Sequence, residues 1–237
     1  MSELSTMRRI GLLGGMSWES TALYYRLLNE GVRDRLGGHH SADLVMRSVD
    51  FAEIVAQQES GDWAAAAAVL AEAARGVEAA GAQTLLICAN TMHKVADDVA
   101  AAVGVPLLHI ADVVAESLQR QQIDTVGLLA TRYTMEDRFY ADRLGAHKIN
   151  TVVPDRGDRE IVHRIIYSEL VKGVITDASR QTMINIIDRL AQRGVGGVVL
   201  GCTEIELLIS SADTELPVFP TTALHCTAAL DLALSPA

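Results

Sequence analysis

The strongest constraint on the fold is a pattern that occurs twice along the sequence. Residues 10–15 form an apolar run that ends in glycines, and a similar run recurs at 126–131. An internal repeat of about a hundred residues indicates that one structural unit is built twice. Superposing the two copies aligns residues 89–91 with residues 202–204, and each of these triplets follows a further apolar run.

The local pattern predicts alternating strands and helices. Short apolar runs without polar alternation are typical of strands buried on both faces of a parallel sheet, and apolar residues at helical spacing indicate amphipathic helices. The strands are predicted at 10–15, 44–49, 84–88, 106–110, 126–131, 152–153, 198–200 and 218–220. The helices are predicted from Ser17, over 62–81, 94–103, 112–121, 157–171 and 177–193, and from Thr222.

This alternation predicts an α/β protein with two pseudo-symmetric domains, each a mostly parallel sheet flanked by helices. The first domain is predicted to comprise residues 1–114 with 215–237, because the C-terminal segment is too short for a domain and is expected to return to the first copy. The second domain is predicted to be 115–214. Equivalent strand ends would then face each other across a cleft between the domains, where we expect the active site.

The composition limits which partners and which cellular compartment are expected. The net charge of −10 argues against a nucleic-acid partner, which favours a basic face. The chain has three cysteines, an odd number without close pairing, so we expect no disulfide framework and a cytoplasmic location. No apolar run suits a signal peptide or a membrane span, so no membrane partner is expected. The sequence is compatible with a homodimer.

The first glycine-rich turn is a candidate anion site. A strand, the turn at Gly14-Gly15 and a helix that Ser17 or Ser20 can cap would gather backbone N–H groups around an anion. The turn lacks both the spacing of a dinucleotide fingerprint and a Gly-Lys-Ser/Thr sequence, which argues against a nucleotide. A carboxylate is the better-sized ligand.

The residues after the 198–200 strand carry the candidate chemistry. Cys202 follows Gly201 directly, at the strand end where α/β sheets bind ligands. A free cysteine in this place is either a small packed side chain or an acid/base thiol. If it is an acid/base thiol, we expect strand-end N–H groups and Thr203 to lower its pKa. Glu204 either tunes this thiol or is held by helix N–H groups.

Two facing strand ends suit a reaction that moves a proton on both faces of one carbon. Removing a proton from one face and returning it to the other inverts a stereocentre, and a thiol and a thiolate can do this near neutral pH. Such a site needs neither a metal nor a cofactor if N–H groups and hydroxyls stabilise the carbanion.

Three motifs resemble the aspartate/glutamate racemase superfamily, and most closely its bacterial broad-specificity amino-acid racemases. They are Ile10-Gly-Leu-Leu-Gly-Gly-Met-Ser17, Asn90-Thr-Met-His93 and Gly201-Cys-Thr-Glu204. The resemblance covers nearly the whole chain. It implies racemisation of a small-molecule amino acid, aspartate, glutamate or a broader range, without pyridoxal phosphate or any other cofactor.

The resemblance also implies roles for individual residues. Cys202 matches a catalytic thiol, and Asn90, Thr91 and Thr203 match residues that bind the substrate carboxylate and stabilise the planar intermediate. Met16 and Gln58 match positions that line the pocket. Lys172 matches a lysine that binds a side-chain carboxylate.

Ala89 departs from this pattern. Related proteins carry cysteine or threonine there, and alanine can neither donate nor accept a proton. Either another residue takes the role, or the reaction uses one acid/base group, or the chain is impaired. The alternatives to a racemase are therefore a single-cysteine decarboxylase or isomerase of the same superfamily, and a silent protein that binds small acids.

Neighbouring residues offer no simple replacement for the missing group. Cys88 precedes Ala89, and strand alternation predicts that its side chain points to the opposite face. Cys226 is predicted to pack in the C-terminal helix. His93 is predicted to orient the turn, with a general-base role as the alternative.

Overall fold

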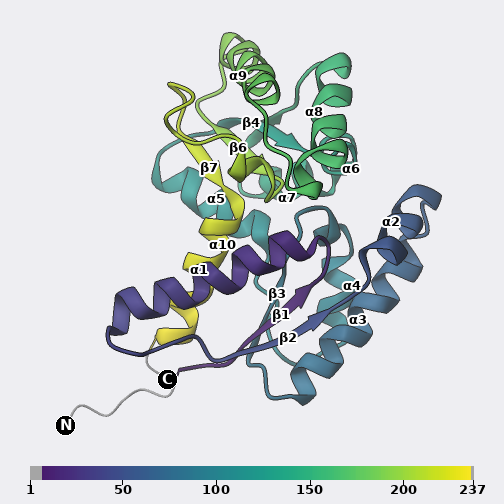
Figure 1. Ribbon diagram of the computed structural model, residues 1–237, viewed down its shortest axis with the longest axis vertical. Coiled ribbons are helices and arrows are strands. Elements are labelled where there is room, and N and C mark those ends of the chain that lie inside the picture. The colour runs from purple at the N-terminus through teal and green to yellow at the C-terminus, as the bar shows by residue number, and fades with distance from the viewer. Residues whose placement is uncertain (1–6, 236–237) are drawn as a thin grey trace. The chain divides into compact units, whose positions relative to one another are not determined.

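The computed structural model describes residues 7–235, which form two compact units. One unit ends at His109 and resumes at His225, and the other is Ile110–Leu224. Each unit contains one parallel sheet flanked by helices, as predicted (Figure 1).

The first unit is built on the strand order β2-β1-β3. All neighbours in this sheet are parallel, and Leu13 of β1 pairs with Arg47 of β2 and Ile87 of β3. The strands are β1 (Ile10–Gly14), β2 (Leu44–Ser48) and β3 (Thr84–Ile87). The helices are α1 (Trp18–Leu36), α2 (Phe51–Ser60), α3 (Trp63–Ala79), η1 (Thr91–Val95), α4 (Ala96–Ala101) and, for its larger part, α10 (Thr221–Leu234).

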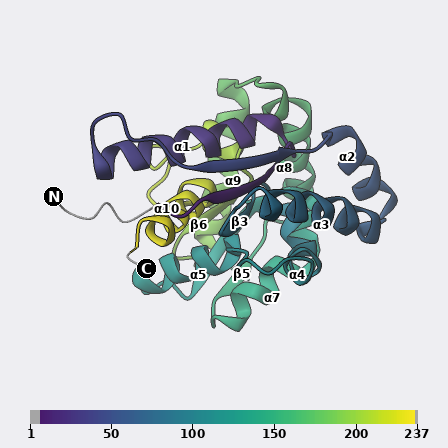
Figure 2. The same ribbon diagram turned by 90° about the horizontal axis from the view of Figure 1, so that it is seen from below.

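Side-chain alternation divides the core of this unit between the two faces of the sheet. On one face, Leu13 and Ile87 pack with the alanine-rich α3 and with α4. On the other, Leu12 and Leu86 pack with α1 and the C-terminal part of α10. Figure 2 shows the sheet of this unit with α1 and α3 on different sides. Both faces are covered, which explains why these strands read as continuous apolar runs.

The second unit repeats the order as β5-β4-β6 and adds β7 at the edge. All four strands are parallel, and Ala130 at the end of β4 pairs with Gly201 at the end of β6. The strands are β4 (Thr125–Ala130), β5 (Asn150–Val152), β6 (Val198–Gly201) and β7 (Val218–Pro220). The helices are α5 (Ile110–Arg120), α6 (Arg132–Glu136), α7 (Arg138–Ala146), α8 (Arg156–Ser168), η2 (Leu170–Lys172), α9 (Asp177–Gln192) and η3 (Ile205–Leu207).

The two strand orders confirm the internal repeat. β3 lies beside β1 as β6 lies beside β4, so residues 89–91 and 202–204 follow equivalent strands.

The structure differs from the sequence-based division in the C-terminal segment. β7 pairs with β6, and its Phe219 is buried in the core of the second unit, so the segment before His225 does not belong to the first. The predicted strand at 106–110 is also wrong. Only Leu107 forms a bridge there, to Leu85, because Pro106 has no N–H to donate and α5 begins at Ile110.

The turn after β1 is closed by its own hydrogen bonds. Ser17 caps α1, since its side chain accepts a bond from the Ser20 N–H at 3.2 Å, and the Gly15 N–H donates to the Thr21 hydroxyl at 2.8 Å. Two of the N–H groups expected to hold an anion are therefore already bound within the turn. Gly15 has φ +93°, and a Cβ there would overlap the Val49 carbonyl oxygen.

We predict that Gly15→Ala destabilises the fold more than a matched substitution at Gly61. Both glycines have positive φ, but a Cβ at Gly61 meets no atom within 4 Å. Left-handed backbone alone costs about 1–2 kcal/mol, and crowding adds about 1–3 kcal/mol for Gly15→Ala. Urea unfolding of both variants measures the difference. Equal losses would show that contact with Val49, directly after β2, does not constrain this turn.

Candidate functional site

Cys202 lies directly after β6 in the second unit, with the residue 7% exposed. Its thiol donates a hydrogen bond to Glu204 Oε2 at 3.0 Å, and the Thr203 hydroxyl donates to the same oxygen at 2.8 Å. Cys202, Thr203 and Glu204 therefore form one hydrogen-bonded group at a strand end. This is the edge at which open α/β sheets bind their ligands.

The Cys202 thiol is held in its protonated form. Burial raises its pKa well above the usual value, and the negative charge of Glu204 and the hydrogen bond to that carboxylate raise it further. The backbone N–H groups of Glu204 and Ile205 act in the opposite direction but more weakly. The predicted lowering of this pKa is wrong, because burial and an adjacent carboxylate outweigh the strand-end N–H groups.

Glu206, which sequence reasoning missed, is a partly buried carboxyl group two residues after Glu204. Its Oε1 accepts hydrogen bonds from the Thr222 N–H at 2.8 Å and the Thr221 hydroxyl at 3.5 Å, at the start of α10. Burial raises its pKa from 4.5 to about 7 against these bonds, and the charge of Glu204 adds to the rise. The clue to this residue in the sequence was a carboxyl group between Ile205 and Leu207, within an apolar stretch.

Lys172 is exposed at the end of η2, also in the second unit. It precedes Gly173, whose φ of 71° ends that turn. Its role toward a side-chain carboxylate stays a prediction.

The other predicted site residues lie in the first unit and are all buried. Ala89 packs in the same cluster as Met16 and Met92, and the Gln58 amide donates to Met92 Sδ at 3.2 Å. These residues are therefore brought together on the α3 face of the sheet. Their exposed fractions are 6% for Met16, 5% for Gln58, 8% for Ala89, 4% for Asn90 and 7% for Thr91.

His93 holds the turn that carries Ala89. Its Nδ1 lies 2.9 Å from the Ala89 carbonyl oxygen, and its ring lies 4.7 Å from that of His109. Burial lowers the pKa of His93 well below its usual value, and His109 and His225 lower it further. A neutral imidazole that donates from Nδ1 supports the predicted orienting role.

Cys88 and Cys226 are structural residues, as predicted. Both are fully or almost fully buried in the α1 face cluster, whereas Ala89 belongs to the α3 face cluster. Burial raises the pKa of the Cys88 thiol far above its usual value. Cys88 therefore does not replace the acid/base group that Ala89 lacks.

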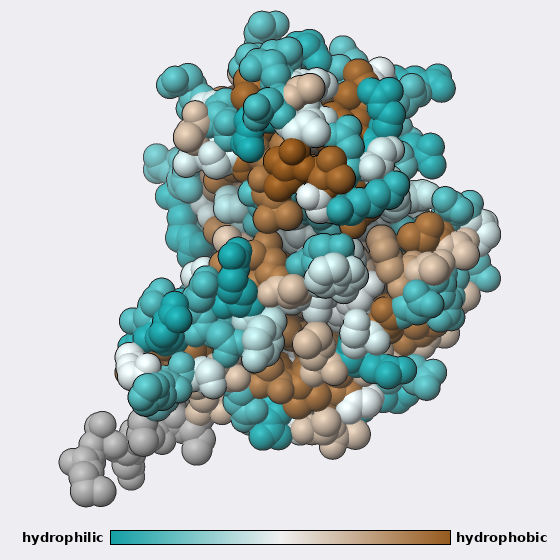
Figure 3. Space-filling view, in the orientation of Figure 1, coloured by the Kyte–Doolittle hydropathy of each residue, from teal (hydrophilic) through white to brown (hydrophobic). Residues whose placement is uncertain are grey.

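The part of the chain that the structure describes contains neither a grouped metal site nor a membrane-spanning helix. Within residues 7–235, no three histidine, cysteine or acidic side chains are grouped as metal ligands. Over the same part of the chain, every helix is too short or too polar to cross a bilayer. On the face drawn in Figure 3, hydrophilic side chains surround separate hydrophobic patches.

Comparison with known proteins assigns the family. Residues 13–229 match the Asp/Glu/Hydantoin racemase family. The chain belongs to this racemase family. The resemblance found in the sequence motifs is thereby confirmed.

Solved structures of racemase-family proteins agree with this assignment. A Yersinia pestis protein with a proposed Asp/Glu racemase activity is 52% identical and superposes with a TM-score of 0.91, covering 97% of this chain and 100% of that one. An aspartate racemase homologue from Pyrococcus horikoshii is 33% identical, with a TM-score of 0.85 over 97% and 100% of the two chains. The Picrophilus torridus aspartate racemase, 22% identical with a TM-score of 0.75 over 95% and 94%, shares the fold.

We predict that Glu204→Gln lowers the pKa of the Cys202 thiol. The substitution removes the charge that opposes a thiolate while keeping a similar side-chain shape. Ultraviolet absorbance of the thiolate, titrated in a Cys88→Ala, Cys226→Ala background, reports this pKa. Glu206→Gln is the matched control, because Glu206 is not among the groups that shift Cys202. An unchanged titration in Glu204→Gln would contradict the assigned contact.

We predict that Glu206 makes the fold less stable as the pH rises. Between about pH 4.5 and 7 the folded chain retains a proton that the unfolded chain has lost, so its stabilising effect is full below 4.5 and is lost by about 7. The difference corresponds to roughly 3 kcal/mol. Urea unfolding across this range should give a flatter pH profile for Glu206→Gln than for the unmodified chain. The exposed Glu160→Gln variant serves as control, and a profile like the control's would refute the prediction.

Proposed function

We propose that this chain is a cofactor-independent amino-acid racemase that transfers the α-proton through Cys202. The observation that carries the proposal is the thiol of Cys202 at the end of β6, hydrogen-bonded to a carboxylate. Membership of the racemase family and the 52% identity to the Yersinia pestis protein support the reaction class. Aspartate and glutamate are the proposed substrates, in line with the names of these relatives.

The protonation state of Cys202 determines whether it acts first as an acid or as a base. A thiol with a raised pKa is an acid at rest, so it is suited to protonate a planar carbanion at the α-carbon. To act as a base the thiol must first lose its proton, and Glu204 Oε2 is the acceptor in contact with it. We therefore assign Glu204 as the group that positions the thiol and keeps its proton on the sulfur until a carbanion takes it.

The substrate carboxylate is assigned to the hydrogen-bonding residues beside the two strand ends. Asn90 and Thr91 follow β3, and Thr203 follows β6. We propose that they bind the α-carboxylate and stabilise the negative charge that develops on it. Lys172 is proposed to bind a side-chain carboxylate.

Ala89 supports a second candidate function, which is chemistry on one face only. It occupies the repeat position equivalent to Cys202, and a methyl group there leaves one strand end without an acid. A decarboxylase or isomerase that protonates a carbanion from a single side needs only Cys202. A small-acid binding protein without turnover is the remaining alternative.

Proton exchange in D₂O separates these functions. If Cys202 works alone, one enantiomer of aspartate or glutamate should gain α-deuterium faster than it inverts. Loss of a positioned acid/base group costs about 10²–10⁴-fold, so Ala89→Cys or Ala89→Thr should raise inversion by a factor in this range. Mass spectrometry with chiral chromatography measures both rates.

Cys202→Ala is expected to abolish exchange, whereas Cys226→Ala should retain it. If the unmodified chain inverts as fast as it exchanges and Ala89→Cys adds nothing, another residue supplies the second acid. Release of CO₂ from an arylmalonate would favour the decarboxylase. Binding of an amino acid with no exchange at all would refute both enzymatic functions.

A further inference from the structure

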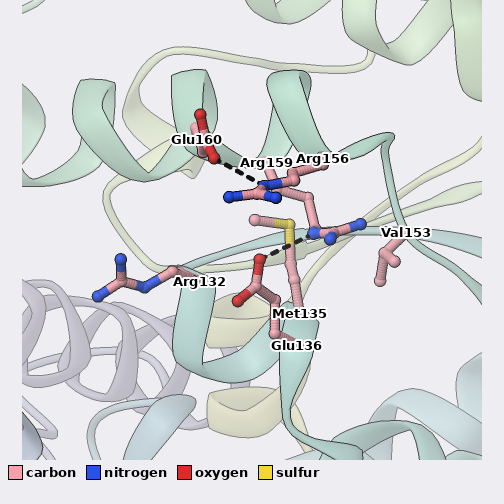
Figure 4. Close-up of a pocket in the computed structure, with 7 residues that line it drawn as sticks. All are labelled: Arg132, Met135, Glu136, Val153, Arg156, Arg159 and Glu160. Atoms are coloured by element: carbon pink, nitrogen blue, oxygen red, sulfur yellow. Dashed lines mark hydrogen bonds and ion pairs between the residues drawn. The ribbon is translucent and has the colours of Figure 1, made fainter.

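A pocket lies within the second unit, and none of the residues already assigned to the candidate site lines it. Its volume is about 620 Å³, within the usual range for small-molecule sites. It is lined by residues from α6, the segment after β5 and the start of α8, so it sits beside the carboxyl ends of β4 and β5 (Figure 4). Cys202 follows β6, which neighbours β4 on the side opposite β5.

Charged side chains dominate the lining. Three arginines, Arg132, Arg156 and Arg159, outnumber two glutamates, Glu136 and Glu160. A local excess of positive charge is notable in a chain whose net charge is −10. Guanidinium groups present several N–H donors in a planar fork that matches carboxylate and phosphate oxygens.

Arg159 is held in place by the protein. Its Nε donates to Glu136 at 3.1 Å and its Nη1 donates to the Pro154 carbonyl oxygen at 2.9 Å, with only 22% of the side chain exposed. These two bonds leave the Nη2 end of the guanidinium available. A donor already fixed in position loses little conformational entropy when it binds a ligand.

Arg156 and Arg132 are less constrained. The pair formed by Arg156 and Glu160 is strongly exposed, so little free energy opposes an exchange of partner. Within residues 7–235, Arg132 forms no ion pair, and its guanidinium lies over the Tyr133 ring at 5.4 Å. Figure 4 shows Arg132 extending away from the two ion pairs.

The backbone adds to the positive character of the pocket. α8 begins at Arg156, and its N-cap residue Asp155 makes no side-chain capping bond, so the helix N-terminus faces this region uncapped. The Arg132 N–H donates to His163 Nδ1 at 3.3 Å, which ties the start of α6 to α8. The arginines of the two helices are thus joined in one assembly.

We propose that this pocket binds a small anion with two or more negative charges, through the guanidinium groups of Arg132, Arg156 and Arg159. The ligand chemistry is a phosphate or a polycarboxylate. The Glu136 and Glu160 carboxylates remain at the sides, where they can accept hydrogen bonds from hydroxyl or ammonium groups of a larger ligand.

Calorimetric titration of the full chain with inorganic phosphate and with citrate, at constant ionic strength in chloride, tests the proposal. At least one probe should bind, and Arg159→Gln should weaken it by about tenfold or more, since a bond to a charged group is lost. Arg132→Gln should also weaken it, and because Arg132 is exposed we expect this variant to keep its fold. The two probes distinguish a phosphate site from a carboxylate site.

Arg138→Gln is the matched control. Like Arg156, Arg138 is the first residue of a helix whose N-cap aspartate makes no side-chain capping bond. Its side chain is 86% exposed, as is that of Arg156, and it also forms an i,i+4 ion pair. Arg138 does not line this pocket. It should leave binding unchanged, as should Cys202→Ser. Failure of both probes to bind, equal weakening by Arg138→Gln, or loss of binding in Cys202→Ser would each overturn the proposal.

Discussion

Parallel pairing around one central strand is the constraint on which both units depend. In a parallel sheet all strands end at the same edge, and each connection must cross back along a face. β3 lies beside β1 as β6 lies beside β4, so the residues after β3 and after β6 lie at equivalent positions in their own units. Ala89 in the first unit and Cys202 in the second therefore follow equivalent strands but differ in chemistry.

The repeat made most of this architecture predictable. Aliphatic runs such as Ile10–Gly14 and Val198–Gly201 have to be strands covered on both faces, and the glycines and capping residues mark their ends. The C-terminal segment was harder to assign because β7 is an edge strand of three residues. Its place beside β6 depends on the burial of Phe219, which local pattern does not reveal.

Candidate residues for the site could be named from the sequence, but their electrostatics could not be predicted from it. Cys202 and its neighbours could be named from one motif, whereas the direction of the thiol pKa depends on how deeply the sulfur is buried and which way the Glu204 carboxylate turns. The role of Glu206 depends on contact with Thr222, which is distant in the sequence. Such three-dimensional contacts are not encoded in spacing.

The path of the chain has a consequence for biosynthesis. The second unit is inserted into the first, whose α1 face is completed only by residues from His225 onward. While the ribosome is still extending the chain, Leu12 and Leu86 lack their cover from α10. The inserted unit already has all its strands once β7 has emerged, so it can fold before the unit that precedes it. Translation from the N-terminus therefore leaves the first sheet half covered until the last helix is made.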